Sequence, residues 1–296
     1  MNYYEEIRTE LMNNEVYKRI KDCSKNRSDL STYYKVGKLL NDAGKNYGEE
    51  IIKKYSERLL ADVGKIYTRR TLFRIRQFYI MFSNKKVSTL STLLSWSHYV
   101  ELLSLNDINE INYYIKISEE QNLSVRNLRD KIKSKEYERL DEKTKNKIIN
   151  KLEYDAVDFV KNPILIKNSY DYENISEKIL QKLILENISS FLRELGAGFS
   201  YIDNEYKIKV GDTYNYIDLL LYNIKFKCYV VIELKVTKLK KEHTGQIQTY
   251  MNYIDRNVKE VNDNKTVGII ICKKNNEYVI DYCSDNRVIA REYELV

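Results

Sequence analysis

The chain has 296 residues, with 50 Lys and Arg against 43 Asp and Glu and a formal net charge of +7. This length accommodates two domains of ordinary size. No run of about 18 apolar residues is present, so no transmembrane helix is predicted, and the charged start MNYYEEIRTEL is unlike a signal peptide. Four cysteines without CxxC spacing and two histidines argue against a zinc cluster. Free thiols in a reducing cytoplasm are the simplest interpretation.

The charge is unevenly distributed. Residues 1–150 hold 29 Lys and Arg against 21 Asp and Glu, whereas residues 151–296 hold 21 against 22. Residues 51–100 alone carry ten basic and two acidic side chains. A concentrated basic surface predicts a polyanionic partner, bound through phosphate contacts and counterion release. The alternative is a lysine-rich composition that serves solubility only.

The N-terminal half reads as a series of amphipathic helices. Apolar stripes predict helices over residues 3–23, 31–43, 48–63 and 68–82, the second and third ending near Gly44 and Gly64. Further helices are expected from about Trp96, from 107 to 120 and from 124 to 133. We expect Trp96 to anchor the core and His98 to pack or hydrogen-bond rather than to act in catalysis.

Basic side chains gather on and around the helix predicted at residues 68–82, which begins at the N-cap candidate Thr68. Its apolar stripe is expected in the core, whereas the basic side chains are candidates for phosphate contacts. The predicted nucleic-acid-binding residues are Lys65, Arg69, Arg70, Arg74, Arg76, Lys85 and Lys86.

The pattern changes after a densely charged segment. We predict a helical, basic domain over 1–145, a connector over 146–165 that contains the only proline, and an α/β domain over 166–296. In the last domain, a long helix begins at Ser176 and ends near Leu195. Strands are expected at about 198–203, 205–210, 214–222, 229–234, 266–272, 278–282 and 288–293, with a helix over 240–256. The fold class is therefore α+β with two domains and a mixed sheet in the second.

Charged side chains interrupt the two most apolar strands of this domain. Asp218 lies in the first strand, and Glu233 and Lys235 close the second. Side chains alternate along a strand, so Glu233 and Lys235 share a face, and a hairpin would bring Asp218 beside them. Paired carboxylates suit a magnesium ion, and a nearby ammonium can orient its water. The alternative is a solvated face, since Glu-x-Lys is a common triplet.

These residues resemble the PD-(D/E)xK (PDDEXK) nuclease superfamily, and specifically its YhcG type. The resemblance rests on IDLLLY at 217–222, VVIELK at 230–235, Gly245-Gln246 and Tyr250. It extends upstream through SEK at 176–178, FLRELGAGF at 191–199 and LSWSHY at 94–99, and so covers nearly the whole chain.

The resemblance implies a restriction-endonuclease-like fold and a winged-helix-like, DNA-binding N-terminal domain, although the sequence shows no convincing wing strands. It implies catalytic roles for Glu177, Gln246 and Tyr250 beside Asp218, Glu233 and Lys235. It also implies that Asp218, Glu233, the Leu234 backbone carbonyl and Glu177 hold Mg²⁺, with Mn²⁺ as the alternative ion. Glu177 in the first turn of a helix equally suits the helix dipole, and Glu186 and Glu194 are less favoured candidates for its role.

Two further residues bear on the resemblance. The proline that precedes the first metal-binding Asp in the superfamily is replaced here by Ile217. We expect His243 to be a surface residue at the start of its helix rather than a general base.

The predicted function is a cytoplasmic, Mg²⁺-dependent endonuclease, a phosphodiester hydrolase that acts on DNA. The alternative is a catalytically silent nucleic-acid-binding or docking subunit of a restriction or mobile-element system. Association as a homodimer is left open, as are the form of the substrate and its sequence specificity, because one sequence matches no side chain to a base.

Overall fold

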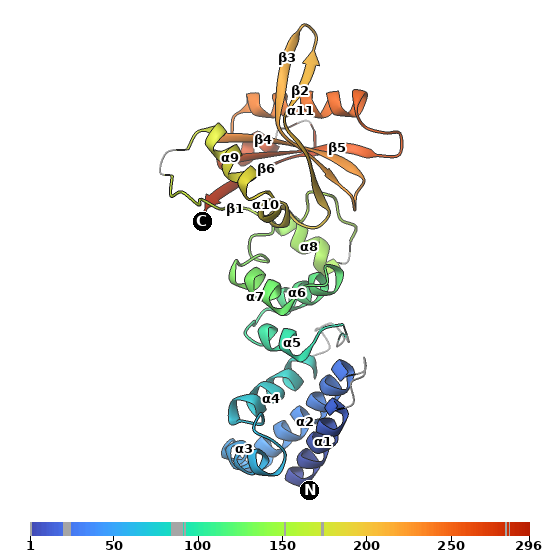
Figure 1. The fold of residues 1–296 in the computed structure, drawn as a ribbon, viewed down its shortest axis with the longest axis vertical. Coiled ribbons are helices and arrows are strands. Elements are labelled where there is room, and N and C mark those ends of the chain that lie inside the picture. The colour runs from blue at the N-terminus through green and yellow to red at the C-terminus, as the bar shows by residue number, and fades with distance from the viewer. Residues whose placement is uncertain are drawn as a thin grey trace. The chain divides into compact units, whose positions relative to one another are not determined.

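A computed structural model describes residues 2–19, 25–83, 91, 93–150, 152–172, 175–281, 283 and 285–296. The chain divides into two compact units, Met1–Tyr137 and Glu138–Val296 (Figure 1). Of the helices within these ranges, none combines the length and apolar character needed to cross a membrane. The fold class is α+β with two units, as predicted.

Helices are the regular secondary structure of the described part of the first unit (Figure 1). Its core consists of side chains such as Ile7, Leu40, Ile52 and Leu72, each fully buried where α1, α2, α3 and α4 pack together. No wing strand occurs in the described part of this unit, so the winged-helix resemblance stays a prediction. The helices are α1 (Tyr3–Arg19), α2 (Lys25–Tyr47), α3 (Glu50–Asp62), α4 (Arg69–Ser83), α5 (Trp96–Leu102), α6 (Ile108–Glu120) and α7 (Val125–Lys133).

Several local predictions for this unit are confirmed, but the predicted bounds of the second helix are wrong. Asp107 and Ser124 cap α6 and α7 as expected. His98 has a hydrogen-bonding role, since its ring nitrogens contact Ser95 and the Leu123 carbonyl oxygen. Helix α2, however, begins at Lys25 rather than near Ser31, and it does not stop at Gly44 but continues to Tyr47. The residue that takes the left-handed conformation is Gly48, with φ +80, because the chain turns there into α3.

The second unit is built around a mixed sheet with helices on both faces (Figure 1). The strand order is β1-β6-β5-β4-β3-β2, in which β2, β3 and β4 are antiparallel neighbours and β4, β5, β6 and β1 are parallel. The elements are α8 (Glu142–Asn150), β1 (Ile164–Ile166), α9 (Glu177–Glu186), α10 (Ile188–Leu195), β2 (Phe199–Val210), β3 (Thr213–Asn223), β4 (Cys228–Lys238), α11 (Lys241–Asn257), β5 (Asn264–Lys274), α12 (Glu277–Asp281) and β6 (Val288–Leu295).

Apolar side chains of the central strands pack to both sides, which is why β4 and β5 read as continuous apolar runs. Val230, Ile232 and Leu234 pack with α9 and α10 on one face. Val231 and Ile270 pack with α11 on the other face. A charged side chain in the middle of such a strand is therefore enclosed by protein.

Three predicted elements differ from the structure. The long helix from Ser176 is two helices, α9 and α10, separated at Asn187. The strands expected at 198–203 and 205–210 form one strand, β2, which has a register shift between Tyr201 and Asp203. The strand expected at 278–282 is wrong, because residues 277–281 form α12 and Tyr282 lies outside the described residues. The parallel strands β5 and β6 need a crossover between them, and α12 lies within it.

The segment that precedes the sheet is bonded into the second unit. Arg139 donates hydrogen bonds to Glu194 and to the Pro163 carbonyl oxygen. Arg291 of β6 donates to the Val160 carbonyl oxygen and forms an ion pair with Asp141. The segment expected as a connector, 146–165, thus lies within the second unit.

Gly268 of β5 generates a stability prediction. A Cβ atom there would lie 2.6 Å from Met251 Sδ and 2.9 Å from Ile247 Cδ1 of α11. Gly268→Ala should therefore push α11 from the sheet and lower the free energy of unfolding by about 1–3 kcal/mol. The matched control is Gly245→Ala, because a Cβ at Gly245 meets nothing within 4 Å and alanine favours a helix. Equal unfolding midpoints in urea for the two variants would contradict this packing argument.

Candidate active site

Asp218 lies where β3 separates from β4. The paired register of these strands ends at Leu219 and Ile232, and one step further places Asp218 opposite Glu233. At this point the Asp218 carboxylate takes the place of a backbone carbonyl as the acceptor for β4. Its Oδ2 accepts a hydrogen bond of 2.7 Å from the Leu234 backbone N–H. Gln181 of α9 donates to the Asp218 carbonyl oxygen at 2.9 Å. The position of Asp218 is thus held by both its main chain and its side chain.

Glu233 is buried in the centre of the sheet. The residue is 2% exposed. Its Oε1 accepts a hydrogen bond of 2.7 Å from Lys235 Nζ, while its buried Oε2 has no hydrogen-bond partner. Lys235 Nζ also lies 3.6 Å from Glu177 Oε2, at the first residue of α9. The structure therefore brings together Glu177, Glu233 and Lys235 as well as Asp218.

The carboxylates have raised pKa values. Burial first, and then the negative charge of Asp218, raise the pKa of Glu233 to about 7. Burial also raises the pKa of Asp218, although the Leu234 N–H and Lys235 act in the opposite direction. For Lys235, burial acts to lower the pKa, but the Glu233 and Glu177 carboxylates outweigh it and raise the pKa. Additional positive charge would stabilise this arrangement.

Helix α11 contributes two more of the predicted residues. Gln246 Nε2 donates to the Tyr250 hydroxyl at 2.9 Å, as their i, i+4 spacing suggested. Tyr250 is 4% exposed, and its pKa is raised by burial and by the charges of Glu233 and Asp218. Tyr250 therefore lies on the α11 side of the sheet, near enough to Glu233 and Asp218 for their charges to act on its hydroxyl.

Three residues near this group were not predicted to belong to it. His243 is 7% exposed, so the expectation of a surface residue is wrong. Its Nδ1 accepts a hydrogen bond from the Lys240 backbone N–H, and burial followed by the charge of Lys235 lowers its pKa. Gln181 holds Asp218, as described above, and its i, i+4 spacing from Glu177 was an available signal. Glu205 of β2 lies near enough for its charge to raise the pKa of Asp218.

The alternative acidic residues of α9 and α10 lie elsewhere. Glu194 accepts hydrogen bonds from Arg139 and from the Leu165 backbone N–H. Glu186 is 3.8 Å from Lys182 on the exposed side of α9. Glu177 is the one of the three that approaches Lys235.

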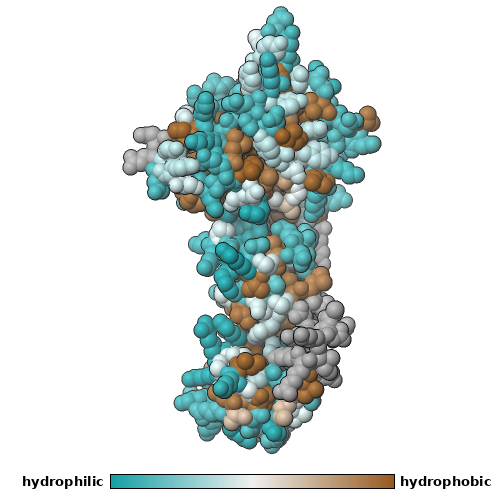
Figure 2. Space-filling view, viewed as in Figure 1, coloured by the Kyte–Doolittle hydropathy of each residue, from teal (hydrophilic) through white to brown (hydrophobic). Residues whose placement is uncertain are grey.

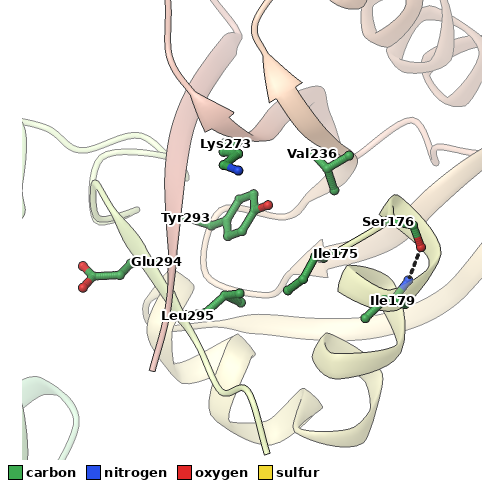
Figure 3. Close-up of a pocket in the computed structure, with 8 residues that line it drawn as sticks. All are labelled: Ile175, Ser176, Ile179, Val236, Lys273, Tyr293, Glu294 and Leu295. Carbon is green, nitrogen blue, oxygen red and sulfur yellow. Dashed lines mark hydrogen bonds between the residues drawn. The ribbon is translucent and has the colours of Figure 1, made fainter. Parts of the chain in front are cut away.

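An open cavity of about 680 Å³ adjoins the site on the α9 side (Figure 3). Ser176 and Val236, the chain neighbours of Glu177 and Lys235, form part of its wall. Figure 3 shows the Tyr293 ring lying across the cavity between Ile175, Leu295 and Lys273. None of the predicted site residues that the structure describes lines it.

The site offers carboxylate oxygens as ligands for a divalent cation. Within the described ranges, no group of three or more His, Cys, Asp and Glu side chains could by itself hold a metal ion. Asp218 and Glu233 supply two carboxylates, and the free Glu233 Oε2 is a buried acceptor without a donor. Mg²⁺ is commonly held by one or two carboxylates and keeps several waters. The residues present fit that mode of binding.

The predicted basic residues of the first unit differ in their surroundings. Lys65, Arg69 and Arg70 are exposed, whereas Arg74 and Arg76 are partly covered. Arg76 forms an ion pair with Glu49, and Arg69 lies 3.9 Å from Glu50. Lys85 and Lys86 lie outside the described residues.

A mixed sheet that carries Asp218 and the Glu233-x-Lys235 pair at diverging strands, with an acidic helix residue beside them, defines a PDDEXK-type nuclease fold. Comparison with known families agrees with this class. Residues 157–296 match the YhcG PDDEXK nuclease domain, and residues 12–139 match the DUF1016 N-terminal domain. Residues 157–296 therefore form a domain of the YhcG type of the PDDEXK nuclease superfamily.

Known proteins similar to the chain include nucleases. A protein of Escherichia coli (strain K12) named "Putative nuclease YhcG" is 23% identical over 313 aligned positions, which cover 90% of this chain and 83% of that protein. A repair endonuclease from Pyrococcus abyssi matches at 22% identity and a TM-score of 0.30, over 43% of this chain and 49% of that one. An EndoMS–dsDNA complex matches at 17% identity and a TM-score of 0.29, over 44% and 48% of the two chains.

The raised pKa of Glu233 generates a prediction for the metal-free protein. The folded chain holds this proton more tightly than the unfolded chain, so the free energy of unfolding should fall as the pH rises from about 4.5 to about 7. Glu233→Gln removes the buried charge. The variant should therefore be more stable than the wild type by about 1–3 kcal/mol above about pH 7, and this difference should vanish below about pH 4.5. Unfolding in EDTA across this pH range measures the difference. Parallel pH profiles for the two proteins would contradict the assignment.

Proposed function

We propose that the protein is a Mg²⁺-dependent endonuclease that hydrolyses phosphodiester bonds in DNA. The observation that carries the proposal is the arrangement of Asp218, Glu233 and Lys235, in which a half-buried and a buried carboxylate meet one ammonium. A protein that only binds nucleic acid has no need to bury an incompletely bonded carboxylate in its sheet. The family to which residues 157–296 belong supports the same reaction class.

Asp218, Glu233 and the Leu234 backbone carbonyl would hold Mg²⁺ or Mn²⁺, with Glu177 acting through water or a second ion. When bound, the cation lowers the pKa of a water molecule and stabilises negative charge on the phosphate. The Asp218 carboxylate is already oriented by the Leu234 N–H, so little rearrangement is needed to present its other oxygen.

Lys235 is the positioning group for the attacking water. Its Nζ lies between Glu233 Oε1 and Glu177 Oε2, at 2.7 and 3.6 Å. An ammonium that donates one hydrogen bond to Glu233 and lies at ion-pair distance from Glu177 can donate its other hydrogens to a water or to a phosphate oxygen. Gln246 donates to the Tyr250 hydroxyl oxygen and so orients the hydroxyl, whose O–H can then donate a hydrogen bond to the same water network.

The catalytically silent binding subunit remains the second candidate. The basic imbalance of residues 51–100 favours nucleic-acid binding under either function. Metal binding that depends on Asp218 and Glu233 separates the two, because only the nuclease needs it.

The proposal is tested with purified full-length protein and DNA substrates in Mg²⁺ or Mn²⁺. Asp218→Asn, Glu233→Gln and Lys235→Ala should each lower the cleavage rate by at least about a hundredfold. Lys235→Ala should keep Mn²⁺ binding, measured calorimetrically, whereas Asp218→Asn should weaken it.

The matched control is Lys182→Ala, an exposed lysine of α9 whose contact is with Glu186. Its cleavage rate should equal that of the wild type. Cleavage by all three site variants at the wild-type rate would overturn the proposal, and so would wild-type protein that binds DNA but neither cleaves it nor binds the metal.

The role proposed for the first unit has a separate test. The salt dependence of DNA binding is the slope of the logarithm of the binding constant against the logarithm of the salt concentration. Replacing Arg69 and Arg70 with glutamine should reduce the magnitude of this slope by about 1.8, as expected for two lost phosphate contacts. Arg76→Gln should instead lower stability, because Arg76 is partly buried on Glu49. An unchanged slope for the double variant would remove α4 from the proposed interface.

A further inference from the structure

The hairpin of β2 and β3 projects from the sheet of the second unit (Figure 1). The strands are joined by a two-residue turn, Gly211 and Asp212, between the paired residues Val210 and Thr213. One face of the hairpin packs against the core of the second unit. Ile208 and Ile217 are buried there, with Tyr206 and Val210 packed against the same cluster.

The opposite face carries a ladder of lysines and tyrosines. In the strand register, Lys207 is opposite Tyr216 and Lys209 is opposite Tyr214, so these four side chains share a face. Tyr214 and Tyr216 are 58% and 52% exposed. Lys207 Nζ lies 4.0 Å from the centre of the Tyr214 ring and Lys209 Nζ lies 5.9 Å from it. Figure 2 shows the projecting end mostly in teal and white, as expected for this composition.

This face leads directly to the candidate active site. Ile217 points into the core, and alternation therefore directs its neighbours Tyr216 and Asp218 to the other side. Along a strand, residues two apart are separated by about 6.6 Å. Along β2, Lys209, Lys207 and Glu205 therefore follow one another toward Asp218. Glu205 lies nearest to the Asp218 carboxylate.

We propose that this ladder binds an unpaired nucleic-acid strand and guides it to Asp218 and Glu233. The inference rests on the proposed nuclease function and narrows its substrate class. Lysines contact phosphates, and exposed tyrosine rings stack on bases, a combination found where single strands are bound without sequence preference. In a duplex the base faces are stacked on one another, so the two rings would have no partner.

A second protein strand is a poorer occupant of this hairpin. Strand β2 is an edge of the sheet and has backbone groups facing outward. Lysines on an edge strand oppose pairing with another strand. The same lysines favour a polyanion, so charge complementarity selects the nucleic acid. The expected substrates are single strands, or duplexes that carry a single-stranded tail at the cleavage point.

The test measures binding separately from cleavage. Fluorescence anisotropy in EDTA would compare a single-stranded DNA, the RNA of the same sequence and the corresponding DNA duplex as probes for the full chain. Tyr214→Ser with Tyr216→Ser should weaken single-strand binding at least tenfold and leave duplex binding unchanged. Lys207→Gln with Lys209→Gln should reduce the salt slope for single strands by about 1.4. Tyr278→Ser, at an exposed tyrosine of α12, is the matched control and should bind as the wild type does.

The outcomes are distinct. If the double variants lose more affinity for single-stranded DNA than for RNA, the ladder binds DNA, and the reverse result means that it binds RNA. Wild-type single-strand binding by both double variants would overturn the inference, and so would an equal loss of duplex binding. A change in oligomeric state without loss of single-strand binding would also overturn it, in favour of an interface between copies. Failure of Mg²⁺-dependent cleavage with intact, ladder-dependent binding would instead count against the proposed nuclease function alone.

Discussion

The burial of the Glu233 carboxylate is the constraint on which the second unit depends. Its strand, β4, lies inside the sheet and is covered on both faces, so a charged group there must find its partners within the fold. Lys235 bonds one oxygen, and the other has no hydrogen-bond partner. A protein selected for stability alone would place an apolar residue at this position. The buried carboxylate therefore indicates that the residue at this position has a chemical role and does not serve packing alone.

The separation of β3 from β4 at Asp218 links the site to the rest of the domain. Because the Asp218 carboxylate occupies the Leu234 N–H, the ladder between the strands cannot continue outward. Strand β3 then pairs with β2 alone, and the two form the projecting hairpin. Gln181 fastens the same point to α9, whose first residue is Glu177. Two hydrogen bonds at Asp218 therefore hold the site together: the one from Leu234 marks where the projecting hairpin begins, and the one from Gln181 ties that point to α9.

Sequence patterns predicted the parts of this arrangement that depend on short-range periodicity. Alternation placed Glu233 and Lys235 on one face, and i, i+4 spacing paired Gln246 with Tyr250. They failed where a long-range contact decides the outcome. The segment at 277–281 has strand-like residues but lies in the crossover between two parallel strands, where a short helix forms. His243 is buried because α11 packs against the sheet beside Lys235, and Glu205 approaches Asp218 through strand pairing. Neither fact is visible in the local sequence.

Charge balance connects the burial of the site to its proposed cation. Asp218, Glu233 and Glu177 surround one ammonium, so the group has a formal charge of minus two when every carboxylate is ionised. Among these four residues only Lys235 is cationic, so the group resists full ionisation, and the pKa of Glu233 rises to about 7. A divalent cation supplies the missing charge and favours the ionised carboxylates, so its binding is coupled to the release of a proton. The affinity of the site for the cation should therefore increase with pH through the range in which Glu233 titrates. Because the pKa of Glu233 lies near neutrality, modest changes in pH or cation concentration determine whether its carboxylate is ionised.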